Sequence, residues 1–425
     1  LLKKNTTNMN IIYNLGISLY SLGVRIASVR NKKARLMREG QAQTFGILDR
    51  QVEKAEKYVW IHVSSLGEFE QGRPLIEMMK RNNPSTRILL TFFSPSGYEV
   101  CKNYTLADII CYLPFDKPKK VRRFLDAVDI EKAIFVKYEF WGNYLHELHR
   151  RAIPTYIISA IFRPTQMFFR PYGGLFRKML HCYDTLFVQD EQSATLLRSV
   201  GVTNVEIAGD TRFDRVTDIL ENKVDLPIVE IFSRGSFTLF AGSSWEPDEE
   251  FLIPFFNSHP GMKMVLAPHE LSRERIEGIC AKLTRPYVLY TETTKEKAAE
   301  ADCLIIDCYG ILSKSYRFAT TAYVGGGFGA GIHNINEAAV YGIPVVFGPN
   351  YGKFKEARDL IAIEGAFAIA DGKEFAQIME RLLNDGAYLK EHGEIAGRYI
   401  KEHLGATRRI YARLFPNQPS APANI

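Results

Sequence analysis

Two carboxylates stand where a parallel sheet would place catalytic groups. Glu68 lies in SSLGEFEQGRP, directly after the apolar run YVWIHV at 58–63, and Glu139 lies in KYEFWGN, after KAIFV at 132–136. A carboxylate at the C-terminal end of a strand can act as a general base that faces a ligand crevice. Glu139, which has aromatic neighbours, can position a substrate instead.

Both carboxylates also have an ordinary structural interpretation. Ser65 and Glu68 have the spacing of a capping box, in which the two side chains cap a helix, and Glu139 can be a solvated loop residue. Pro74 suits the first turn of a helix, so we expect that helix to begin near 71–73 and to leave Glu68 on a loop. Spacing alone leaves both interpretations open, although two carboxylates on neighbouring strand ends favour the functional one.

The strongest local signal is TTAYVGGGFGAGIHNINEAAVYGIP, in which a strand, a glycine-rich turn and a helix follow one another. Its glycines, Gly326 and Gly327 among them, allow a ligand to approach the backbone closely. The helix N-terminus beyond them suits a phosphate group. Glu337 can accept hydrogen bonds from ribose hydroxyls, or form a capping box with Asn334. His333 can donate to a phosphate or be an ordinary loop histidine.

Further candidates follow other strands of the second half. Ser243 and Ser244, in AGSSWEPDEE, can bind phosphate or cap the next helix. His269 and Arg273, in APHELSRER, are candidate nucleotide contacts, whereas we expect Arg275 to be solvated.

Two basic features lie in the first half. Arg212, in GDTRFD, is expected near the cleft, with an ordinary surface arginine as the alternative. The segment 163–180 interleaves phenylalanine and tyrosine with arginine and lysine. This pattern suits a phosphorylated amphiphile at a membrane, and it equally suits a helix with a buried aromatic face and a solvated basic edge.

The elements that must position these residues follow a repeating pattern. Short apolar runs alternate with helix-like stretches, which is typical of parallel sheets built from βαβ units. The runs lie at 58–63, 87–93, 108–113, 132–136, 155–159, 185–188 and 205–209, and then at 237–243, 263–268, 286–290, 303–307, 320–326, 343–348 and 366–370. A charged segment without a strand separates the two sets. The sequence therefore predicts an α/β protein with two Rossmann-like, doubly wound domains that face a cleft.

The N-terminus does not follow the alternating pattern. Residues 9–29 are apolar with scattered polar residues, and the basic residues Arg30, Lys32, Lys33, Arg35 and Arg38 come next. This segment suits a marginal transmembrane anchor or a helix that lies in the membrane interface, and a soluble helix packed on the first domain is the alternative. No small-residue cleavage site of a signal peptide is evident.

The predicted organisation has five parts. They are a membrane-associated segment at 1–40, an acceptor-binding domain at 41–214, a linker at 215–236, a nucleotide-sugar-binding domain at 237–415 and a tail at 416–425.

Composition sets the outer limits. The 425 residues are 46% hydrophobic and 24% charged, which excludes a disordered or low-complexity chain. A net charge of +6 fits a nucleotide, an anionic lipid surface or a phosphorylated substrate, and is too weak to indicate a nucleic-acid partner. None of the six cysteines forms a CxxC pair, so we expect no metal site and a reducing, cytosol-facing environment.

Taken together, the motifs resemble those of the 3-deoxy-D-manno-octulosonic acid (Kdo) transferases of lipopolysaccharide assembly. The resemblance extends from the N-terminal apolar segment to about residue 400. It is carried by WIHVSSLGE 60–68, LPFDKP 113–118, YEFWGN 138–143, GDTRFD 209–214, GSSWEPDEE 242–250 and GGGFGAGIHNINEAA 325–339. The joint order of these motifs is far more specific than any one of them.

The resemblance implies a GT-B fold with the acceptor in the first domain and the nucleotide sugar in the second. It implies inverting transfer of Kdo from CMP-Kdo to a lipid A precursor of the lipid IVA type. The enzyme would need no metal or other cofactor and would act at the cytoplasmic face of the inner membrane. The family's catalytic base matches Glu68, and its second essential carboxylate matches Glu139. Its CMP contacts match Pro268, His269, Tyr309, Gly310, Ile311, Asn334, Ile335, Asn336 and Glu337.

Several positions depart from the family pattern. Pro268 stands where the family usually has arginine, Tyr309–Ile311 where it often has Met-Gly-Glu, and Arg212 where it has lysine. AIFRPTQMFFR, at 160–170, replaces a segment rich in serine and arginine. These departures concern individual nucleotide contacts and the acceptor more than the reaction. The alternatives are another GT-B lipid-linked sugar transferase, a nucleotide-sugar epimerase, or a non-catalytic, membrane-associated nucleotide-binding module.

Overall fold

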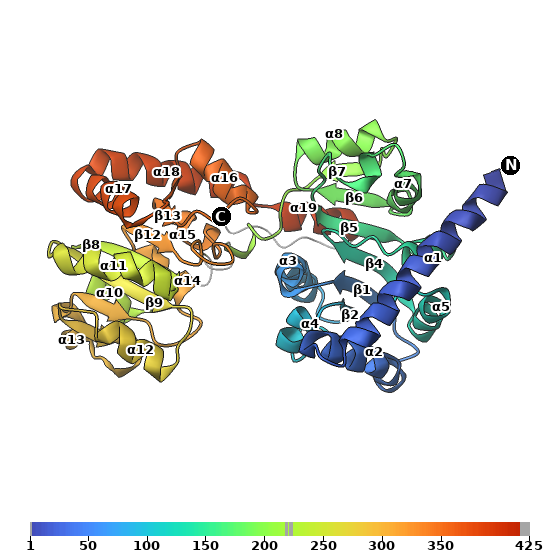
Figure 1. Ribbon diagram of the computed structural model, residues 1–425, viewed down its shortest axis with the longest axis horizontal. Helices are drawn as coiled ribbons and strands as arrows, with labels where there is room; N and C mark the ends of the chain where they lie inside the picture. The colour runs from blue at the N-terminus through green and yellow to red at the C-terminus, as the bar shows by residue number, and fades with distance from the viewer. Residues whose placement is uncertain (1, 217–219, 221–223, 417–425) are drawn as a thin grey trace. The chain divides into compact units, whose positions relative to one another are not determined.

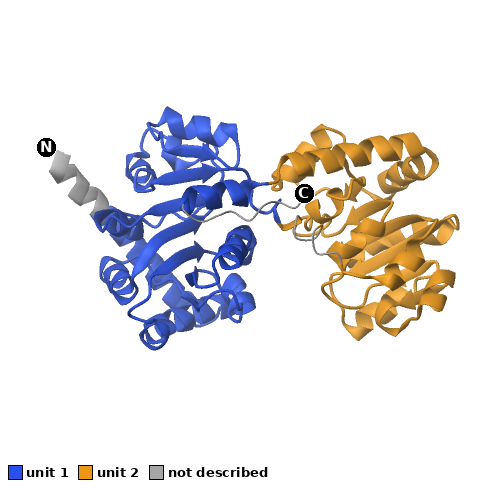
Figure 2. Cartoon of the chain, turned by 180° about the vertical axis from the view of Figure 1, so that it is seen from behind, with its two compact units in different colours: residues 1–214, 405–425 blue, residues 215–404 orange. Residues whose placement is uncertain are grey.

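The computed structural model describes residues 2–216, 220 and 224–416. Contacts divide the chain into two compact units, which Figure 2 distinguishes by colour. Unit 1 comprises residues 1–214 and 405–425, and unit 2 comprises residues 215–404. The predicted linker at 215–236 is described only in part, and residues 417–425 of the predicted tail lie outside the described residues.

Unit 1 alternates strands and helices after two N-terminal helices (Figure 1). Its elements are α1 (Leu2–Ala27), α2 (Lys32–Gln51), β1 (Tyr58–Val63), α3 (Leu66–Asn82), β2 (Arg87–Phe92), α4 (Pro95–Cys101), β3 (Ile109–Tyr112), α5 (Pro118–Ala127), β4 (Ile130–Val136), α6 (Gly142–Arg150), β5 (Thr155–Ala160), η1 (Met167–Phe169), α7 (Gly174–Leu180), β6 (Thr185–Val188), α8 (Glu191–Ser199), β7 (Val205–Ile207) and, at the end of the chain, α19 (Ala406–Leu414).

Unit 2 repeats the same alternation. Its described elements are α10 (Pro227–Ser233), β8 (Phe237–Ser244), α11 (Glu246–Ser258), β9 (Met262–Pro268), α12 (Arg273–Cys280), β10 (Tyr287–Leu289), η2 (Tyr290–Glu292), α13 (Lys295–Glu300), β11 (Cys303–Ile305), α14 (Leu312–Ser315), η3 (Tyr316–Phe318), β12 (Thr321–Val324), α15 (Asn336–Ala339), β13 (Val345–Phe347), α16 (Lys355–Ala362), β14 (Ala366–Ala368), α17 (Gly372–Asn384) and α18 (Gly386–Glu402).

Each unit contains one parallel sheet of seven strands. The strand order is β3-β2-β1-β4-β5-β6-β7 in unit 1 and β10-β11-β9-β8-β12-β13-β14 in unit 2. All of these strands lie on the apolar runs that the sequence predicts, and the prediction of two doubly wound sheets is confirmed. In each sheet the winding direction reverses beside the first strand, between β1 and β4 and between β8 and β12. Ligands of open parallel sheets bind at such a switch point, beyond the C-terminal strand ends.

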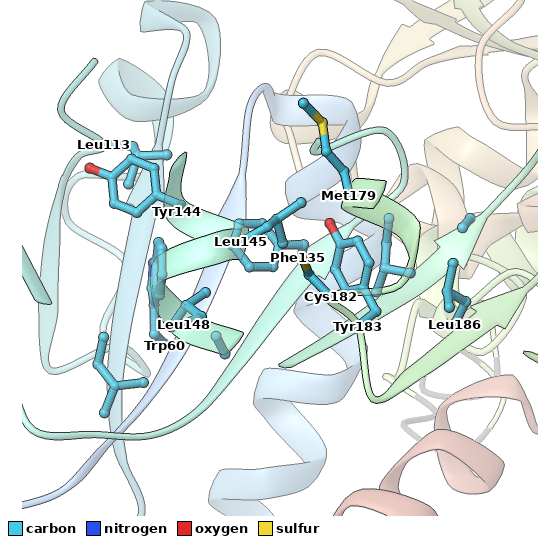
Figure 3. Close-up of a cluster of buried hydrophobic side chains, with 14 of the residues drawn as sticks. Trp60, Leu113, Phe135, Tyr144, Leu145, Leu148, Met179, Cys182, Tyr183 and Leu186 are labelled. Atoms are coloured by element: carbon cyan, nitrogen blue, oxygen red, sulfur yellow. The ribbon is translucent and has the colours of Figure 1, made fainter. Parts of the chain in front are cut away.

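The sheet of unit 1 is buried on both faces, which explains its continuous apolar strands. Successive side chains of β1 point to opposite faces. Trp60 packs with Phe135 and Tyr144 on one face, in the cluster drawn in Figure 3. Ile61 joins the cluster on the other face, against α3 and α19. These two layers fix the ends of β1 and β4, from which the candidate site projects.

Helix α3 begins earlier than the sequence predicts. The position of Pro74 predicts a start near 71–73, but the helix starts at Leu66 with Ser65 as its N-cap, and Pro74 lies inside it. A proline inside a helix costs about 3 kcal/mol because it removes a hydrogen bond and crowds the preceding turn. The cap around Ser65 and the burial of Phe69, Leu75, Ile76 and Met79 offset that cost.

The last helix also differs from the expected domain boundary. The sequence assigns residues up to 415 to the second domain, but α19 belongs to unit 1. Ile410, Tyr411 and Leu414 join the apolar cluster beneath α3. The Asp214 carboxylate accepts from the N–H groups of Gly405 and Thr407 at 2.5 and 2.6 Å. Asp214 thereby caps the start of α19, a contact between segments that no local pattern reveals.

Candidate active site

Glu68 and Glu139 lie on either side of the switch point of unit 1. Glu68 follows β1 and Glu139 follows β4, and these strands are adjacent and parallel, with Ile61 opposite Ile134. The predicted neighbourhood of the two carboxylates is therefore confirmed. Their charges interact, since Glu139 is one of the groups that raise the pKa of Glu68.

Glu68 sits in the first turn of α3, half-buried. Its Oε2 accepts from the Ser65 N–H at 2.9 Å and from the Ser65 hydroxyl at 3.2 Å, so the predicted capping contact is present. Burial and, secondly, the charge of Glu139 raise the pKa of Glu68 above its usual value, against the opposing effect of backbone hydrogen bonds from Ser65 and Ser64. A carboxylate with a raised pKa is a stronger base.

Glu139 is buried and is held by a chain of aromatic donors. Its Oε2 lies 3.1 Å from His62 Nε2 and accepts from Trp141 Nε1 at 2.5 Å. Burial alone would raise the pKa of Glu139, but hydrogen bonds from His62, Ser64 and Trp141 and the charge of His62 outweigh it and lower that pKa. The surroundings therefore favour the ionised form of Glu139, whereas those of Glu68 raise its pKa.

A second layer orients His62. His62 Nδ1 lies 2.9 Å from Thr91 Oγ1, which accepts from Trp60 Nε1 at 2.8 Å. His62 Nδ1 also lies 3.1 Å from the Thr91 carbonyl oxygen, so Thr91 holds one side of the ring while Nε2 faces Glu139. His62 and Trp141 are not among the predicted site residues. A polar residue at the end of an apolar strand, beside a functional turn, was the available signal for His62.

Arg212 reaches the same edge of the sheet. Its guanidinium donates twice to Asp210 Oδ2, at 2.7 and 3.0 Å. Asp210 Oδ1 accepts from Gln71, which lies one turn beyond Glu68 on α3. Burial raises the pKa of the Tyr138 phenol, beside Glu139, and the charges of Arg163, Glu68, Arg212 and Asp210 also act on it. Cationic groups thus lie near the carboxylate pair.

In unit 2, the segments after β8 and β12 meet at the second switch point. The Trp245 ring stacks on His269 with centroids 4.5 Å apart, and the His269 ring centroid lies 4.6 Å from that of His333. Trp245 Nε1 donates to His333 Nε2 at 3.2 Å. Burial and, secondly, the neighbouring His269 lower the pKa of His333, so this ring is neutral near pH 7. The predicted candidate His269 and the missed Trp245 form an aromatic surface suited to a flat ligand.

The glycine-rich turn is explained mainly by packing within the protein. A Cβ on Gly325 would meet the Ser243 carbonyl at 2.3 Å, and one on Gly327 would meet the backbone of Gly348 at 2.6 Å. Gly326 has φ +90° and donates its N–H to the buried Asp248 at 3.1 Å. Glycine at positions 326 and 327 was expected to let a ligand approach the backbone. Packing within the protein offers another reason for these glycines, because the chain itself fills the space that a side chain would need.

The region around Glu337 is polar and partly unsatisfied. Asn334 Nδ2 donates to Glu337 Oε1 at 3.1 Å, and Asn334 Oδ1 accepts from the Asn336 N–H at 3.2 Å. This is an Asn turn rather than the predicted reciprocal capping box, and Ile335 is the N-cap of the four-residue helix α15. Burial raises the pKa of Glu337. Asn336 Oδ1 is buried and has no hydrogen-bond partner among the residues that the structure describes.

Two arginines of α12 differ in exposure from what their predicted roles suggest. Arg273, a predicted nucleotide contact, is 88% exposed and pairs with Glu277 along the helix. Arg275, expected to be solvated, is 18% exposed and pairs with the fully buried Glu249 at 2.6 Å. Ser244 also donates to Glu249, at 2.8 Å. Ser244, at the end of β8, and Arg275, on α12, therefore both hold the Glu249 carboxylate in the first turn of α11.

Two further candidates lie at the ends of β8 and β9. Ser243 has φ +53° and is the second-last residue of β8. Pro268 is the buried last residue of β9. The His269 N–H after it donates to the Ser244 carbonyl at 2.9 Å, which ties the end of β9 to the end of β8.

The last candidates precede the short helix α14. Tyr309 is exposed, Gly310 has φ +92°, and Ile311 is the N-cap of α14. These three residues therefore form a turn that is open to solvent. Among the described residues, no three His, Cys, Asp or Glu side chains gather in a way that could hold a metal ion.

The basic and aromatic segment at 163–180 lies partly in the core and partly at the surface. Phe168 is buried, and Phe169 and Phe176 pack against the same cluster. Arg177 donates to the carbonyls of Phe168 and Arg170, which ties it to the backbone. Tyr172, at 73% exposure, is its most prominent solvent-facing aromatic ring. The ordinary structural interpretation therefore accounts for most of this segment.

Helix α1 has two different faces. Tyr13 and Asn14 contact the start of α6 in unit 1, whereas an apolar stripe is exposed on the other side. The stripe consists of Ile11, Leu15, Leu19, Leu22 and Ile26, and Val29 is exposed just beyond the end of the helix. Among the described residues, no single helix is long and apolar enough to span a membrane, and α1 with α2 meets that criterion only as a pair bent by 117°. The predicted N-terminal membrane helix is not confirmed.

Comparison with known protein families points to one family. Residues 39–215 match the model of the 3-deoxy-D-manno-octulosonic-acid transferase (kdotransferase) domain. The chain is 26% identical to the 3-deoxy-D-manno-octulosonic acid transferase of Aquifex aeolicus, over 81% of this chain and 92% of that protein. It is also 26% identical to the Haemophilus influenzae enzyme of the same name, over 84% and 86%. The resemblance inferred from the motifs is thereby confirmed.

Two further comparisons concern architecture. A bifunctional glycosyltransferase/methyltransferase of Fusobacterium nucleatum is 24% identical over 92% of this chain, which spans 62% of that protein. Among solved structures, UDP-GlcNAc 2-epimerase from Neisseria meningitidis matches with a TM-score of 0.57 at 14% identity, over 85% of this chain and all of that one. At this identity the structural match shows the shared fold alone.

Proposed function

We propose that this chain, a relative of the Kdo transferases, moves Kdo from CMP-Kdo to a lipid A precursor of the lipid IVA type, with inversion at the anomeric carbon. One observation carries the proposal. Two carboxylates flank the switch point of unit 1, and their surroundings shift their pKa values in opposite directions. Opposite shifts of paired titratable groups mark acid–base sites.

Glu68 is the proposed general base. It removes the proton from the attacking hydroxyl of the acceptor, whose oxygen then forms a bond to the anomeric carbon of Kdo. The bond from that carbon to the phosphate oxygen breaks, and the electron pair leaves with CMP. Attack on the face opposite the leaving group inverts the configuration. The capping contact with Ser65 holds Glu68 Oε2 and so orients the carboxylate for proton transfer.

Glu139 is proposed to orient the sugar or the acceptor as an ionised group. Its carboxylate is locked by His62 and Trp141, so it costs little reorganisation when substrate arrives. Arg163 adds positive charge at the same edge, and Arg212 lies there already paired with Asp210; guanidinium groups suit the phosphate and carboxylate groups of the substrates. Glu68 is therefore proposed to transfer the proton, and Glu139 to position the substrate.

Unit 2 is proposed to hold the nucleotide. The stacked Trp245 and His269 offer a flat surface for a base, and Glu337 and Asn336 offer acceptors for ribose hydroxyls. We retain Pro268, Tyr309, Gly310, Ile311, Asn334 and Ile335 as predicted contacts. Arg273 is a poor candidate, since its side chain is exposed to solvent and pairs with its own helix.

The acceptor is an amphiphile, and α1 is proposed to bring the enzyme to its surface. The exposed stripe from Ile11 to Ile26 follows helical spacing, and the basic residues after it are exposed. An apolar stripe beside positive charge is typical of a helix that lies in the interface of an anionic membrane. We infer a position on the cytoplasmic face of the inner membrane, with α1 lying on the membrane rather than crossing it.

The direct test is mass spectrometry of the lipid products. The full-length protein is incubated with tetraacylated lipid A precursor and either CMP-Kdo or a UDP-sugar. The proposal predicts a mass increase of one or more Kdo residues with CMP-Kdo alone. A product from the UDP-sugar would favour another lipid-linked transferase, and conversion of UDP-GlcNAc without a lipid product would favour an epimerase. Nucleotide binding without any product would favour a non-catalytic module.

A further inference from the structure

The start of α6 is capped by residues that are distant in the sequence. The first N–H groups of a helix have no partner within the helix, and α6 begins directly after Glu139, Phe140 and Trp141. Its N-cap, Trp141, provides no capping side chain. Instead, the Gly142 N–H donates to the Tyr13 phenol oxygen at 2.9 Å, and the Asn143 and Tyr144 N–H groups donate to the Asp116 carboxylate, both at 3.0 Å.

Tyr13 and Asp116 form one unit, which we call the α6 cap. The Tyr13 hydroxyl donates to Asp116 Oδ2 at 2.6 Å, and Asp116 is fully buried. Burial raises the pKa of Asp116 to about 6, although the hydrogen bonds from Tyr13, Asn143 and Tyr144 oppose that effect. The α6 cap therefore satisfies the first three N–H groups of the helix with one phenol and one carboxylate.

A second contact joins α1 to α6. Asn143 Nδ2 donates to Asn14 Oδ1 at 2.8 Å and to the Asp116 carbonyl at 2.6 Å. Gly142 is also tightly enclosed, since a Cβ there would meet Met179 Cε at 2.7 Å and the Tyr13 ring at 3.1 Å. Helix α1 is therefore part of the structure that surrounds the first turn of α6.

The Glu139 carboxylate lies in the segment directly before the start of α6. Trp141, the residue before Gly142, donates to Glu139 Oε2 at 2.5 Å, and Tyr183 donates to the Glu139 carbonyl at 2.5 Å. Only Phe140 and Trp141 separate Glu139 from the capped N–H of Gly142. A shift of the α6 start would therefore move both the Glu139 carboxylate and its Trp141 donor.

We propose that Tyr13, through the α6 cap, is a positioning residue for Glu139, so that the N-terminal helix is a working part of the active site. The inference rests on the proposed function for the role of Glu139. It predicts that α1 has two tasks on its two faces. The outer stripe meets the lipid surface, and the inner face holds the catalytic turn in place.

The test uses Tyr13→Phe in the full-length protein, which keeps the ring and removes the oxygen. Tyr20→Phe is the matched control, since Tyr20 lies on the same helix and its hydroxyl makes no hydrogen bond to the residues that the structure describes. Hydrogen exchange of a peptide covering 139–146 reports on the cap without reference to activity. We expect exchange about fivefold faster or more in Tyr13→Phe, unchanged exchange in β4, and wild-type exchange in Tyr20→Phe.

Kinetics then separate positioning from a merely structural role. We expect kcat to fall about fivefold or more, while the KM for CMP-Kdo changes much less, because its nucleotide part is proposed to bind to unit 2. Unchanged exchange at 139–146 would overturn the α6 cap as a holding device. Faster exchange with unchanged kcat would overturn the positioning role, provided that Glu139→Gln itself lowers turnover. If Glu139→Gln retains full turnover, the proposed role of Glu139 is wrong. The hydrogen-exchange result still tests the α6 cap in that case, because it does not depend on activity.

A second variant protects the test against misfolding. Should Tyr13→Phe lower the melting temperature markedly, Asn14→Ala removes only the acceptor for Asn143 Nδ2 on the same helix. Faster exchange and lower kcat in Asn14→Ala support the inference that α1 holds the start of α6, and wild-type values for both contradict a holding role for this contact, so that the exchange of Tyr13→Phe decides the role of the cap.

Discussion

At the scale of residues, Glu68 and Glu139 carry the same functional group in opposite environments. Glu68 is half-buried and feels the charge of its neighbour, whereas Glu139 is buried but locked by aromatic donors. The sequence predicts that both follow strands, because apolar runs bounded by turns are readable. It does not predict their difference, since His62 and Trp141 reach Glu139 only once β1 and β4 are adjacent.

The first prediction concerns the pH dependence of turnover. Glu68 works as a base only when ionised, so activity falls as the pH drops through its raised pKa. Glu139→Gln removes a charge that contributes to raising that pKa. We expect Glu139→Gln to reduce turnover and to move the acid limb of the residual activity to lower pH. The measurement is kcat/KM against pH for both proteins, and an acid limb that stays in place or moves upward contradicts the coupling.

Arg273 and Arg275 show why nearby residues of one type are hard to rank from sequence. Both lie near the start of α12, two positions apart, and successive positions of a helix face different directions. Arg275 turns inward to Glu249, which is a residue of α11. The expectation of a solvated Arg275 was wrong because the facing carboxylate cannot be identified before the fold is known.

At the scale of elements, strands were easier to predict than helix ends. The strands of both sheets are short apolar runs whose burial on both faces leaves a clear signal. The start of α3 was missed because a proline inside a helix is rare, and a local rule cannot weigh it against tertiary burial. The glycine-rich turn was recognised, but the close backbone contacts of Gly325 and Gly327 with other turns emerge only from the fold.

The second prediction concerns the short α15 region. Glu337→Gln keeps an oxygen that can accept from Asn334, so we expect a near-normal melting temperature. A ribose contact predicts weaker binding of CMP, by about tenfold or more, because the charged acceptor is lost. Isothermal titration with CMP measures this. Glu391→Gln, on the exposed face of α18, is the matched control and should bind normally, and unchanged affinity in Glu337→Gln would leave only the structural role.

At the scale of the whole molecule, the chain is two similar units with unequal tasks. Unit 1 carries the carboxylates and α1, and unit 2 carries the aromatic surface and the glycine-rich turn. The sequence predicts two domains from the interruption of the strand pattern. It does not predict that α19 returns to unit 1, because the cap by Asp214 joins residues about 190 positions apart in the chain.

The third prediction concerns membrane attachment. Leu15 and Leu22 are 59% and 52% exposed on the outer stripe of α1, so replacing both with aspartate should leave the fold intact. We expect the Leu15→Asp, Leu22→Asp variant to lose binding to anionic vesicles in a flotation assay, because charge replaces the apolar contact area. Deletion of residues 1–30 should also release the protein, but it removes Tyr13 as well and so does not isolate the stripe.

The control for this prediction is Val100→Asp. Val100 is 66% exposed on α4 and stands outside the stripe. Vesicle binding should persist in this variant. If the Leu15→Asp, Leu22→Asp variant floats with vesicles as well as the wild type does, the stripe is not the main attachment, and the segment at 163–180 becomes the next surface to test.

The central claim is that Glu68 is the base of a sugar transfer. Its most direct test is the turnover of Glu68→Gln with CMP-Kdo and lipid A precursor, beside Glu77→Gln, which makes the same change on the same helix. We predict a loss of roughly 10²–10⁴-fold for Glu68→Gln, with retained CMP binding and melting temperature, and wild-type turnover for Glu77→Gln. Normal turnover by a folded Glu68→Gln variant would contradict the account.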